Sequence, residues 1–194
     1  MKRILLSMAI ILGLPGLAGA AETYQLDLQQ SQIEWVGKKV TGQHNGVVSL
    51  KSGQVTLDGK KITGGEFKVD MTSIKVLDIS DAEKNQKLTN HLNSEDFFAT
   101  ASNPESNFKI NSVKDLGDNK AEITGDLTIK GITKPVTFPA TLSLQGDKIQ
   151  ATGTLKVDRT LYNIRYGSGK FFQGLGDKLI NDEFELKLNL YAKK

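Results

Sequence analysis

The dominant pattern along the chain is an alternation of apolar and polar side chains with a period of two residues. It is clearest in four runs, which cover residues 121–129, 136–144, 149–157 and 184–190. In these runs every second residue is apolar or small, and most of the residues between are charged, Thr or Ser. Because successive side chains of a strand point to opposite faces, this alternation predicts strands with one apolar and one water-facing side.

Shorter alternating runs and the turn residues between them complete the predicted set of strands. The shorter runs surround residues 33–35, 47–50, 55–57, 67–71 and 108–113. Asp58-Gly59 and Gly146-Asp147 each separate two runs, and Gly supplies the positive φ that tight hairpins require. Gly131 and the pair Gly64-Gly65 mark further strand ends. We therefore predict about nine strands that pair mostly antiparallel.

One segment departs from the alternation and predicts a helix. Ser80 is followed three residues later by Glu83, which is the pattern of a capping box at a helix start. Leu88, His91 and Leu92 follow at helical spacing. We predict one helix over residues 81–92, followed by a short turn capped by Ser94.

Antiparallel strands in this number, with a single lateral helix, form either a sandwich or a closed barrel. A barrel pairs every strand edge and leaves a central lumen, and we favour it over the sandwich. The predicted fold class is therefore all-β, an antiparallel barrel of about eight or nine strands with one lateral helix.

The first twenty residues have the composition of a signal peptide. Lys2 and Arg3 precede a run of about 14 mostly apolar residues, short of the ~20 that span a bilayer, and the run closes on Ala18-Gly19-Ala20. We expect cleavage after Ala20 and a single domain over residues 21–194. No later segment is apolar enough to span a membrane, so the mature protein is expected to be soluble outside the cytoplasm.

Charge and cysteine content exclude several classes of function. Without residues 1–20 the chain has 23 basic and 22 acidic residues, a balance that does not favour binding to nucleic acid. The chain has no cysteine, which excludes disulfides, thiolate catalysis and Cys-ligated metal centres. The oligomeric state stays open, a homodimer included.

The interior of a small barrel is either filled by its own side chains or wide enough for one ligand. Small residues recur among the predicted inward positions: Ala121, Gly125, Ala140, Ala151 and Gly153. They leave parts of the lumen without bulky filling, or they fit the taper of a packed core. Composition alone does not decide between these alternatives.

Several motifs occur in order along the mature chain. They are Tyr24-x-Leu26-Asp27, Ser31-x-Ile33-x-Trp35, Gly42-x-His44-x-Gly46-x-Val48, Phe67-x-Val69-Asp70-Met71, Ser73-Ile74, His91-Leu92-x-Ser94-x-Asp96-Phe97-Phe98, Gly125-x-Leu127-Thr128-Ile129-x-Gly131-x-Thr133-Lys134-Pro135-Val136 and Asp158-Arg159-Thr160. In this order they resemble the YceI family of lipocalin-like exported proteins.

The resemblance implies a barrel that encloses a long apolar molecule, such as a polyisoprenoid, an isoprenoid quinone or a fatty amide. It also implies a location in the periplasm of a Gram-negative bacterium, and it favours the open lumen. We expect no cofactor. The expected ligand contacts are Trp35, Phe67, Val69, Met71, Phe108, Ile129, Phe138, Ala140, Leu155, Arg159 and Tyr162.

Arg159, Tyr162 and Arg165 follow a predicted strand and lie in a segment rich in Tyr, Asn and Gly. They ring the barrel mouth and bind a polar head group, for which a guanidinium fork is well shaped, or Asp158 and Arg159 pair to hold the loop to the barrel. The sequence leaves both interpretations open.

His44 and His91 are the only histidines, and their surroundings show no metal-ligand spacing. We expect His44 in a turn around Asn45-Gly46 and His91 at the end of the helix. A hydrolase or lipid-modifying enzyme that uses one of them is the alternative function. Gly167-Ser168-Gly169 lacks the strand–turn–helix context of a nucleophile elbow, so no catalytic residue is predicted.

Overall fold

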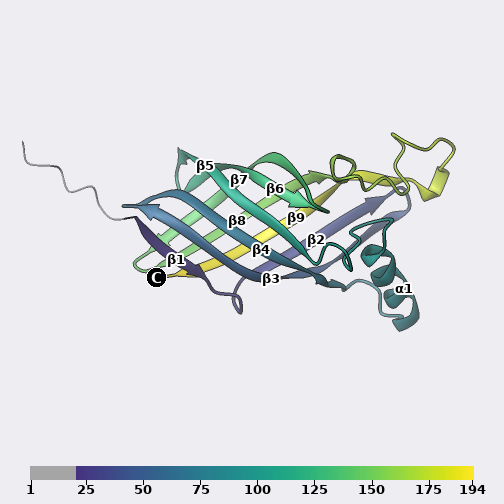
Figure 1. Ribbon diagram of the computed structural model, residues 1–194, viewed down its shortest axis with the longest axis horizontal. Helices are drawn as coiled ribbons and strands as arrows, with labels where there is room; N and C mark the ends of the chain where they lie inside the picture. The colour runs from purple at the N-terminus through teal and green to yellow at the C-terminus, as the bar shows by residue number, and fades with distance from the viewer. Residues whose placement is uncertain (1–20) are drawn as a thin grey trace, which may run out of the picture.

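The computed structural model describes residues 21–194, which form nine strands, one α-helix and two short 3-10 helices. The predicted signal peptide lies outside the described residues. The body is elongated, with the strands running obliquely along its long axis and helix α1 at one end (Figure 1). Within the described residues, no helix is long and apolar enough to cross a membrane.

The strands follow one another along the chain with a single helical insertion. They are β1 (Glu22–Leu26), β2 (Gln32–Lys39), β3 (Gly42–Asp58), β4 (Lys61–Val76), β5 (Glu105–Gly117), β6 (Lys120–Ile129), β7 (Ile132–Gln145), β8 (Lys148–Asp158) and β9 (Ile180–Lys193). The helix α1 (Ala82–Asn93) lies between β4 and β5, and the 3-10 helices η1 (Arg159–Tyr162) and η2 (Gly176–Lys178) lie between β8 and β9.

The sheet closes on itself. From β2 to β9 each strand pairs antiparallel with the next, and β9 pairs back with β2. β1 pairs with the end of β3 and the end of β9, so β1 and β2 share one of eight positions around the barrel. The prediction of an antiparallel barrel rather than a sandwich is confirmed, with β1 as an extra strand.

The side chain of Ser31 bridges the gap between β1 and β2. Where the loop after β1 leaves the sheet, the Ser31 hydroxyl donates to the Tyr191 carbonyl at 3.2 Å and accepts from the Tyr191 N–H at 2.9 Å. The N–H of Asp27 also donates to the Tyr191 carbonyl, at 2.7 Å. These bonds satisfy the backbone of β9 where a strand neighbour is interrupted.

The observed strands differ from the predicted runs at three places. Residues 47–50 and 55–57 belong to the single strand β3, and β1 was not among the predicted runs. Gly64 and Gly65 lie inside β4 rather than at a strand end, since Gly65 pairs with Val55 and Ile110. The turns at Asp58-Gly59, Gly131 and Gly146-Asp147 are as predicted, with positive φ at all three glycines.

Helix α1 lies beside the barrel wall and is tied to β4. Its N-cap is Asp81 rather than the predicted Ser80, and the Asp81 carboxylate accepts from the N–H of Lys84 at 2.9 Å. The Asn85 amide donates to the carbonyls of Val76 and Ile79. Ser94 forms the C-cap and donates to the His91 carbonyl at 2.8 Å, instead of capping a second turn with its side chain.

Gly125 on β6 is a site of close packing rather than empty lumen. A Cβ atom there would lie 2.4 Å from the Lys109 carbonyl oxygen and 2.5 Å from Cζ of Phe108. The ring of Phe108 therefore occupies the space that a side chain at Gly125 would need. Gly64 on β4 differs, because a Cβ atom there would meet no atom of residues 21–194 within 4 Å.

This contrast gives a stability test. We expect Gly125→Ala to lower the free energy of unfolding by about 1–3 kcal/mol, because the added methyl group overpacks against Phe108 and the β5 backbone. The matched substitution Gly64→Ala is expected to change it by less than about 0.5 kcal/mol. Chemical denaturation of both variants measures the difference, and equal effects would contradict the assigned packing.

Candidate ligand-binding site

Two apolar chambers lie end to end inside the barrel. The helix-side chamber, with a volume of about 140 Å³, reaches Leu92 of α1 and Phe97 and Phe98 after it. The far chamber, of about 110 Å³, reaches Leu26 of β1 and Ala192 of β9. The composition of the inward positions did not decide whether the lumen is open or packed. The two chambers show that the lumen is partly open.

Four side chains border both chambers and form a waist between them. They are Ile33 of β2, Val69 of β4, Leu127 of β6 and Leu186 of β9. All four are aliphatic and come from four different strands. The chambers are therefore two parts of one channel along the barrel axis, separated by apolar side chains.

Ten of the eleven expected ligand contacts border this channel. Trp35, Met71, Ile129 and Arg159 border the helix-side chamber, Phe67, Phe108, Phe138, Ala140 and Leu155 border the far chamber, and Val69 borders both. Tyr162 borders neither chamber. Contact with a ligand stays a prediction for the ten residues that border the channel.

Sequence reasoning missed part of the lining. On β9, Phe184, Leu186, Leu188 and Leu190 all face the channel. Their alternation was recognised as a strand, and the same signal could have placed them in the site. The residues that cover the helix end of the channel, Phe97, Phe98 and Ile164, lie outside strands and carry no periodic signal.

The small residues divide into two groups. Ala140 of β7 and Ala151 and Gly153 of β8 border the far chamber. Ala121 and Gly125 of β6 border neither chamber. A Cβ atom at Gly153 would lie 2.9 Å from the Pro139 carbonyl oxygen, so the two glycines permit close packing, whereas Ala140 and Ala151 leave room in the lumen.

Arg159 holds the loop before β9 to the barrel. Its guanidinium donates to the carbonyls of Ile164, Tyr166, Ile180 and Asn181 at 2.8–3.0 Å, and Asp182 lies 3.7 Å away. Burial lowers the pKa of Arg159, which Asp182 and Asp158 oppose. The side chain is only 3% exposed. Arg159 therefore holds the loop, as one interpretation expected, but through backbone carbonyls rather than through a pair with Asp158, which accepts from Lys170 instead. The expectation of a guanidinium open at the mouth is corrected.

Tyr162 is a buried core residue rather than part of an open mouth. The side chain is 1% exposed, and burial raises its pKa to about 12. Its hydroxyl has no hydrogen-bond partner within residues 21–194. The expectation that Tyr162 rings an open barrel mouth is therefore wrong for its position.

Aromatic contacts close the helix end of the channel. The His91 ring packs edge-on against Phe97 and Tyr166, with centroids 4.9 and 4.6 Å away. These residues come from the segment after β4 and the loop after β8, which meet over the channel. The lateral helix and the loop held by Arg159 thus form a common cover, hereafter the cap.

Each histidine is engaged by a carboxylate. His44 Nδ1 lies 2.8 Å from Asp78, and His91 Nε2 lies 3.1 Å from Asp96. His44 and the pair Asn45-Gly46 are inside β3, so the expected turn there is wrong. Over residues 21–194, no group of three His, Cys, Asp or Glu residues gathers in a metal-binding arrangement.

The loop around Ser168 has the geometry of a turn. The Ser168 carbonyl accepts from the N–H groups of Phe171 and Phe172, and its hydroxyl oxygen accepts from the Lys170 N–H at 3.2 Å. Ser168 is buried within the loop, and these bonds satisfy its polar groups. The hydroxyl thus has a structural partner in its own turn.

The fold and the sequence point to the same relatives. The YceI-like domain family matches residues 24–192. The chain belongs to the YceI family. Protein YceI of Escherichia coli O17:K52:H18 is 37% identical over 155 residues, or 76% of each chain. The resemblance drawn from the ordered motifs is thereby confirmed.

Solved structures share the YceI-like barrel. BcnA of Burkholderia cenocepacia aligns with a TM-score of 0.69 and 26% identity, over 87% of this chain and 99% of its own. A polyisoprenoid binding domain from Saccharophagus degradans, implicated in plant cell wall breakdown, aligns with a TM-score of 0.66. That domain is 15% identical over 88% of this chain and 97% of its own, and so shares the fold alone.

Ala140 offers a direct test of the channel. We expect Ala140→Phe to place a ring in the far chamber and to occupy most of its volume of about 110 Å³, because Ala140 borders that chamber. Binding of a long-chain lipid is expected to fall at least tenfold while the melting temperature stays within a few degrees.

The matched control is Thr141→Phe, which adds the same bulk at an exposed neighbouring position of β7. It is expected to retain both lipid binding and stability. If Ala140→Phe instead lowered the free energy of unfolding by about 1–3 kcal/mol and left binding intact, the chamber would be a packed core.

Proposed function

We propose that this protein is a periplasmic carrier or reservoir for a long isoprenoid lipid, which it holds along the barrel axis. The observation that carries the proposal is the pair of apolar chambers joined at an aliphatic waist. A ligand that fills both must be long, narrow and apolar. Membership of the YceI family supports the same function.

Burial alone supplies the affinity that such a carrier needs. Each methylene removed from water contributes roughly 0.8 kcal/mol, so a chain of several isoprene units binds tightly without a charged anchor. The lining agrees with this mode, because aromatic and aliphatic side chains make up most of both chambers. The proposal therefore assigns the barrel a binding role with no chemical step.

The chambers must widen to accept a whole chain. A rigid cavity of about 150 Å³ accommodates one benzene molecule, so each chamber at rest holds a segment of roughly one isoprene unit. A longer chain passes the waist and displaces Val69, Leu127 or Leu186 from their resting rotamers. Leu186 is only half-buried, which leaves it room to move.

Export is part of the proposal. Residues 1–20 have the charged, apolar and small-residue regions of a signal peptide. A carrier in the periplasm would shield an apolar chain from water between membranes. The absence of cysteine in the full sequence agrees with a core that needs no disulfide.

The alternative is an enzyme that uses His44 or His91. Neither histidine borders either chamber of the described barrel, and each is engaged by a carboxylate. A lipid held in the two chambers would therefore contact neither imidazole directly. This arrangement favours the carrier.

The test is recovery of the protein from cells. The full-length precursor, produced in a Gram-negative host, is expected in the periplasmic fraction with an intact mass that begins at Ala21. Organic extraction followed by mass spectrometry is expected to release about one isoprenoid lipid per protein chain. The double variant His44→Ala, His91→Ala is expected to retain this lipid.

Three results would contradict the proposal. Full-length chain in the inner membrane would exclude the cleaved signal. Protein that carries no lipid after gentle purification, and takes up none from added polyprenol, would exclude the carrier. Lipid that is chemically converted by the parent protein but not by the double histidine variant would favour the enzyme.

A further inference from the structure

Two residues that border the helix-side chamber each carry a buried polar atom without a partner. The indole Nε1 of Trp35 and the hydroxyl of Ser106 are enclosed and make no hydrogen bond to any group of residues 21–194. Trp35 lies on β2 and Ser106 on β5, and both border this chamber. Ser106 is 5% exposed. A buried donor without a partner is unfavourable, so a ligand oxygen that accepts from these groups would be stabilised in the chamber.

The positive charges that border the same chamber are already engaged. Arg159 donates to four backbone carbonyls and lies 3.7 Å from Asp182. Lys38 pairs with Glu185 across β2 and β9 at 2.9 Å. A phosphate in the chamber would have to break one of these arrangements or remain buried without a counter-charge, which is strongly unfavourable.

We propose that the helix-side chamber is a head-group site for an uncharged isoprenoid, with Trp35 Nε1 and Ser106 Oγ as hydrogen-bond donors. The inference rests on the proposed function and narrows its ligand class. The head group carries a carbonyl, phenol or alcohol oxygen, as in an isoprenoid quinone or a polyprenol. The apolar tail passes the waist into the far chamber. Polyprenyl phosphates are excluded from this orientation.

The chemistry of the two donors fits this class. An indole N–H only donates, whereas a serine hydroxyl both donates and accepts. A carbonyl oxygen satisfies either group, and an alcohol satisfies both through its oxygen and its proton. Both donors are uncharged, so neither offers the positive charge that a buried phosphate would need.

The experiment compares four probes of equal chain length on delipidated mature protein. They are an isoprenoid quinone, a polyprenol, a polyprenyl phosphate and the isoprenoid hydrocarbon without a head group. Dissociation constants come from gel filtration with mass-spectrometric quantification of the retained lipid. For proteins that keep Trp35, the chain's single tryptophan, quenching of its fluorescence by the quinone reports occupancy of this chamber.

The variants are Ser106→Ala, Trp35→Phe and, as the matched control, Ser112→Ala at an exposed position of the same strand. We expect each of the first two to weaken binding of quinone and polyprenol about tenfold. Binding of the hydrocarbon should stay unchanged in Ser106→Ala, and Ser112→Ala should resemble the parent. The phosphate is expected to bind at least tenfold more weakly than the polyprenol.

The outcomes separate this inference from the proposed function. Binding of the phosphate as tight as that of the polyprenol, or variants that leave head-group binding unchanged, would overturn the head-group site while the carrier stands. Failure of all four probes, the hydrocarbon included, would overturn the carrier itself. Melting temperatures of the variants identify any loss that arises from unfolding.

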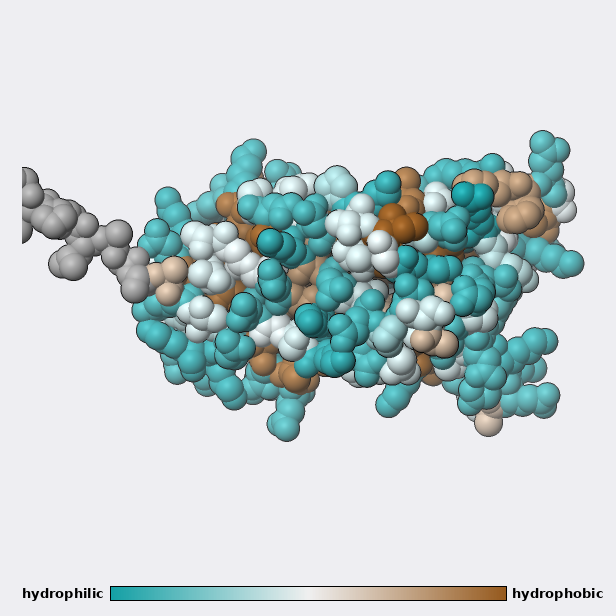
Figure 2. Space-filling view, viewed as in Figure 1, coloured by the Kyte–Doolittle hydropathy of each residue, from teal (hydrophilic) through white to brown (hydrophobic). Residues whose placement is uncertain are grey.

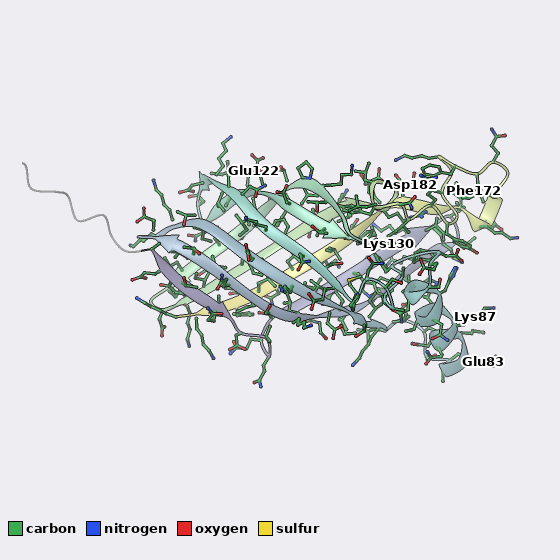
Figure 3. The ribbon with its side chains drawn as sticks, in the orientation of Figure 1. Glu83, Lys87, Glu122, Lys130, Phe172 and Asp182 are labelled. Carbon is green, nitrogen blue, oxygen red and sulfur yellow. The ribbon has the colours of Figure 1, made fainter. Side chains whose placement is uncertain are left out.

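A second, independent observation concerns the outer surface of the cap. Of the nine large hydrophobic residues exposed in the described barrel, four lie between residues 161 and 172. Leu161, Tyr166, Phe171 and Phe172 are each 44–52% exposed. Phe172 lies at the tip of the loop that projects beyond α1, where the molecular surface is apolar (Figures 2 and 3).

Basic side chains surround these aromatic residues. The Arg165 guanidinium lies 4.7 Å from the centroid of the Phe171 ring, and Lys178 is exposed on the same loop. Lys170 is also exposed there, although it pairs with Asp158 at 2.7 Å. Exposed aromatic rings with cations beside them suit the interface of an anionic bilayer, because the rings enter the head-group region and the cations meet lipid phosphates.

We infer that this loop docks the cap of the barrel on an anionic phospholipid bilayer, from which a lipid reaches the channel. Sedimentation with phosphatidylcholine vesicles, with and without one-fifth phosphatidylglycerol, tests it. The parent protein is expected to bind the anionic vesicles at least fivefold better, and added salt should weaken this binding. The double variant Phe171→Ser, Phe172→Ser should lose it.

The control for added polarity is Leu116→Ser, Leu144→Ser, at exposed positions near the β5–β6 and β7–β8 turns. These turns lie at the opposite end of the barrel from α1 (Figure 1). This variant is expected to bind vesicles like the parent. Absence of vesicle binding by the parent, or equal loss in both variants, would overturn the docking surface. A protein complex that needs Phe171 and Phe172 without any vesicle binding would replace the bilayer by a protein partner.

Discussion

The pairing of β9 with the two N-terminal strands is the interaction on which the interior depends. It joins residues more than 140 positions apart, from Gln32 opposite Asn189 to Lys39 opposite Ile180. The Lys38–Glu185 ion pair crosses this seam, and Ser31 bridges its one interruption. An open sheet would expose both the apolar inner face and two strand edges to water, so closure creates the channel and protects it.

The channel remains open because the side chains around it differ in size by position. Ala140 and Ala151 leave room on β7 and β8, whereas the Phe108 ring fills the space beside Gly125 on β6. Aliphatic residues from four strands narrow the middle. The inward-facing residues therefore pack closely at some positions along the barrel axis and leave room for a ligand at others.

The cap combines a rigid anchor with an exposed apolar surface. Arg159 ties the loop after β8 to β9 through carbonyls, and the charge that would be costly to bury is balanced by Asp182 and Asp158. Beyond this anchor, the side chains of Phe171 and Phe172 are exposed to solvent. A loop that is anchored by Arg159 and carries exposed apolar residues suits a segment that contacts a membrane and covers a lipid channel. The orphan donors of Trp35 and Ser106 lie beneath it.

The sequence by itself determined most of the strands and their turns, the helix and the family, because these depend on alternation and short motifs. It also identified nine strand residues that border the channel, since inward positions of a strand follow from the period of two. Only the tertiary structure decided that residues 47–57 form one strand, that β1 and β2 share one position, and that Arg159 and Tyr162 face inward rather than open at a mouth. These features depend on which distant strands and loops pack together, and non-local packing leaves no local pattern in the chain.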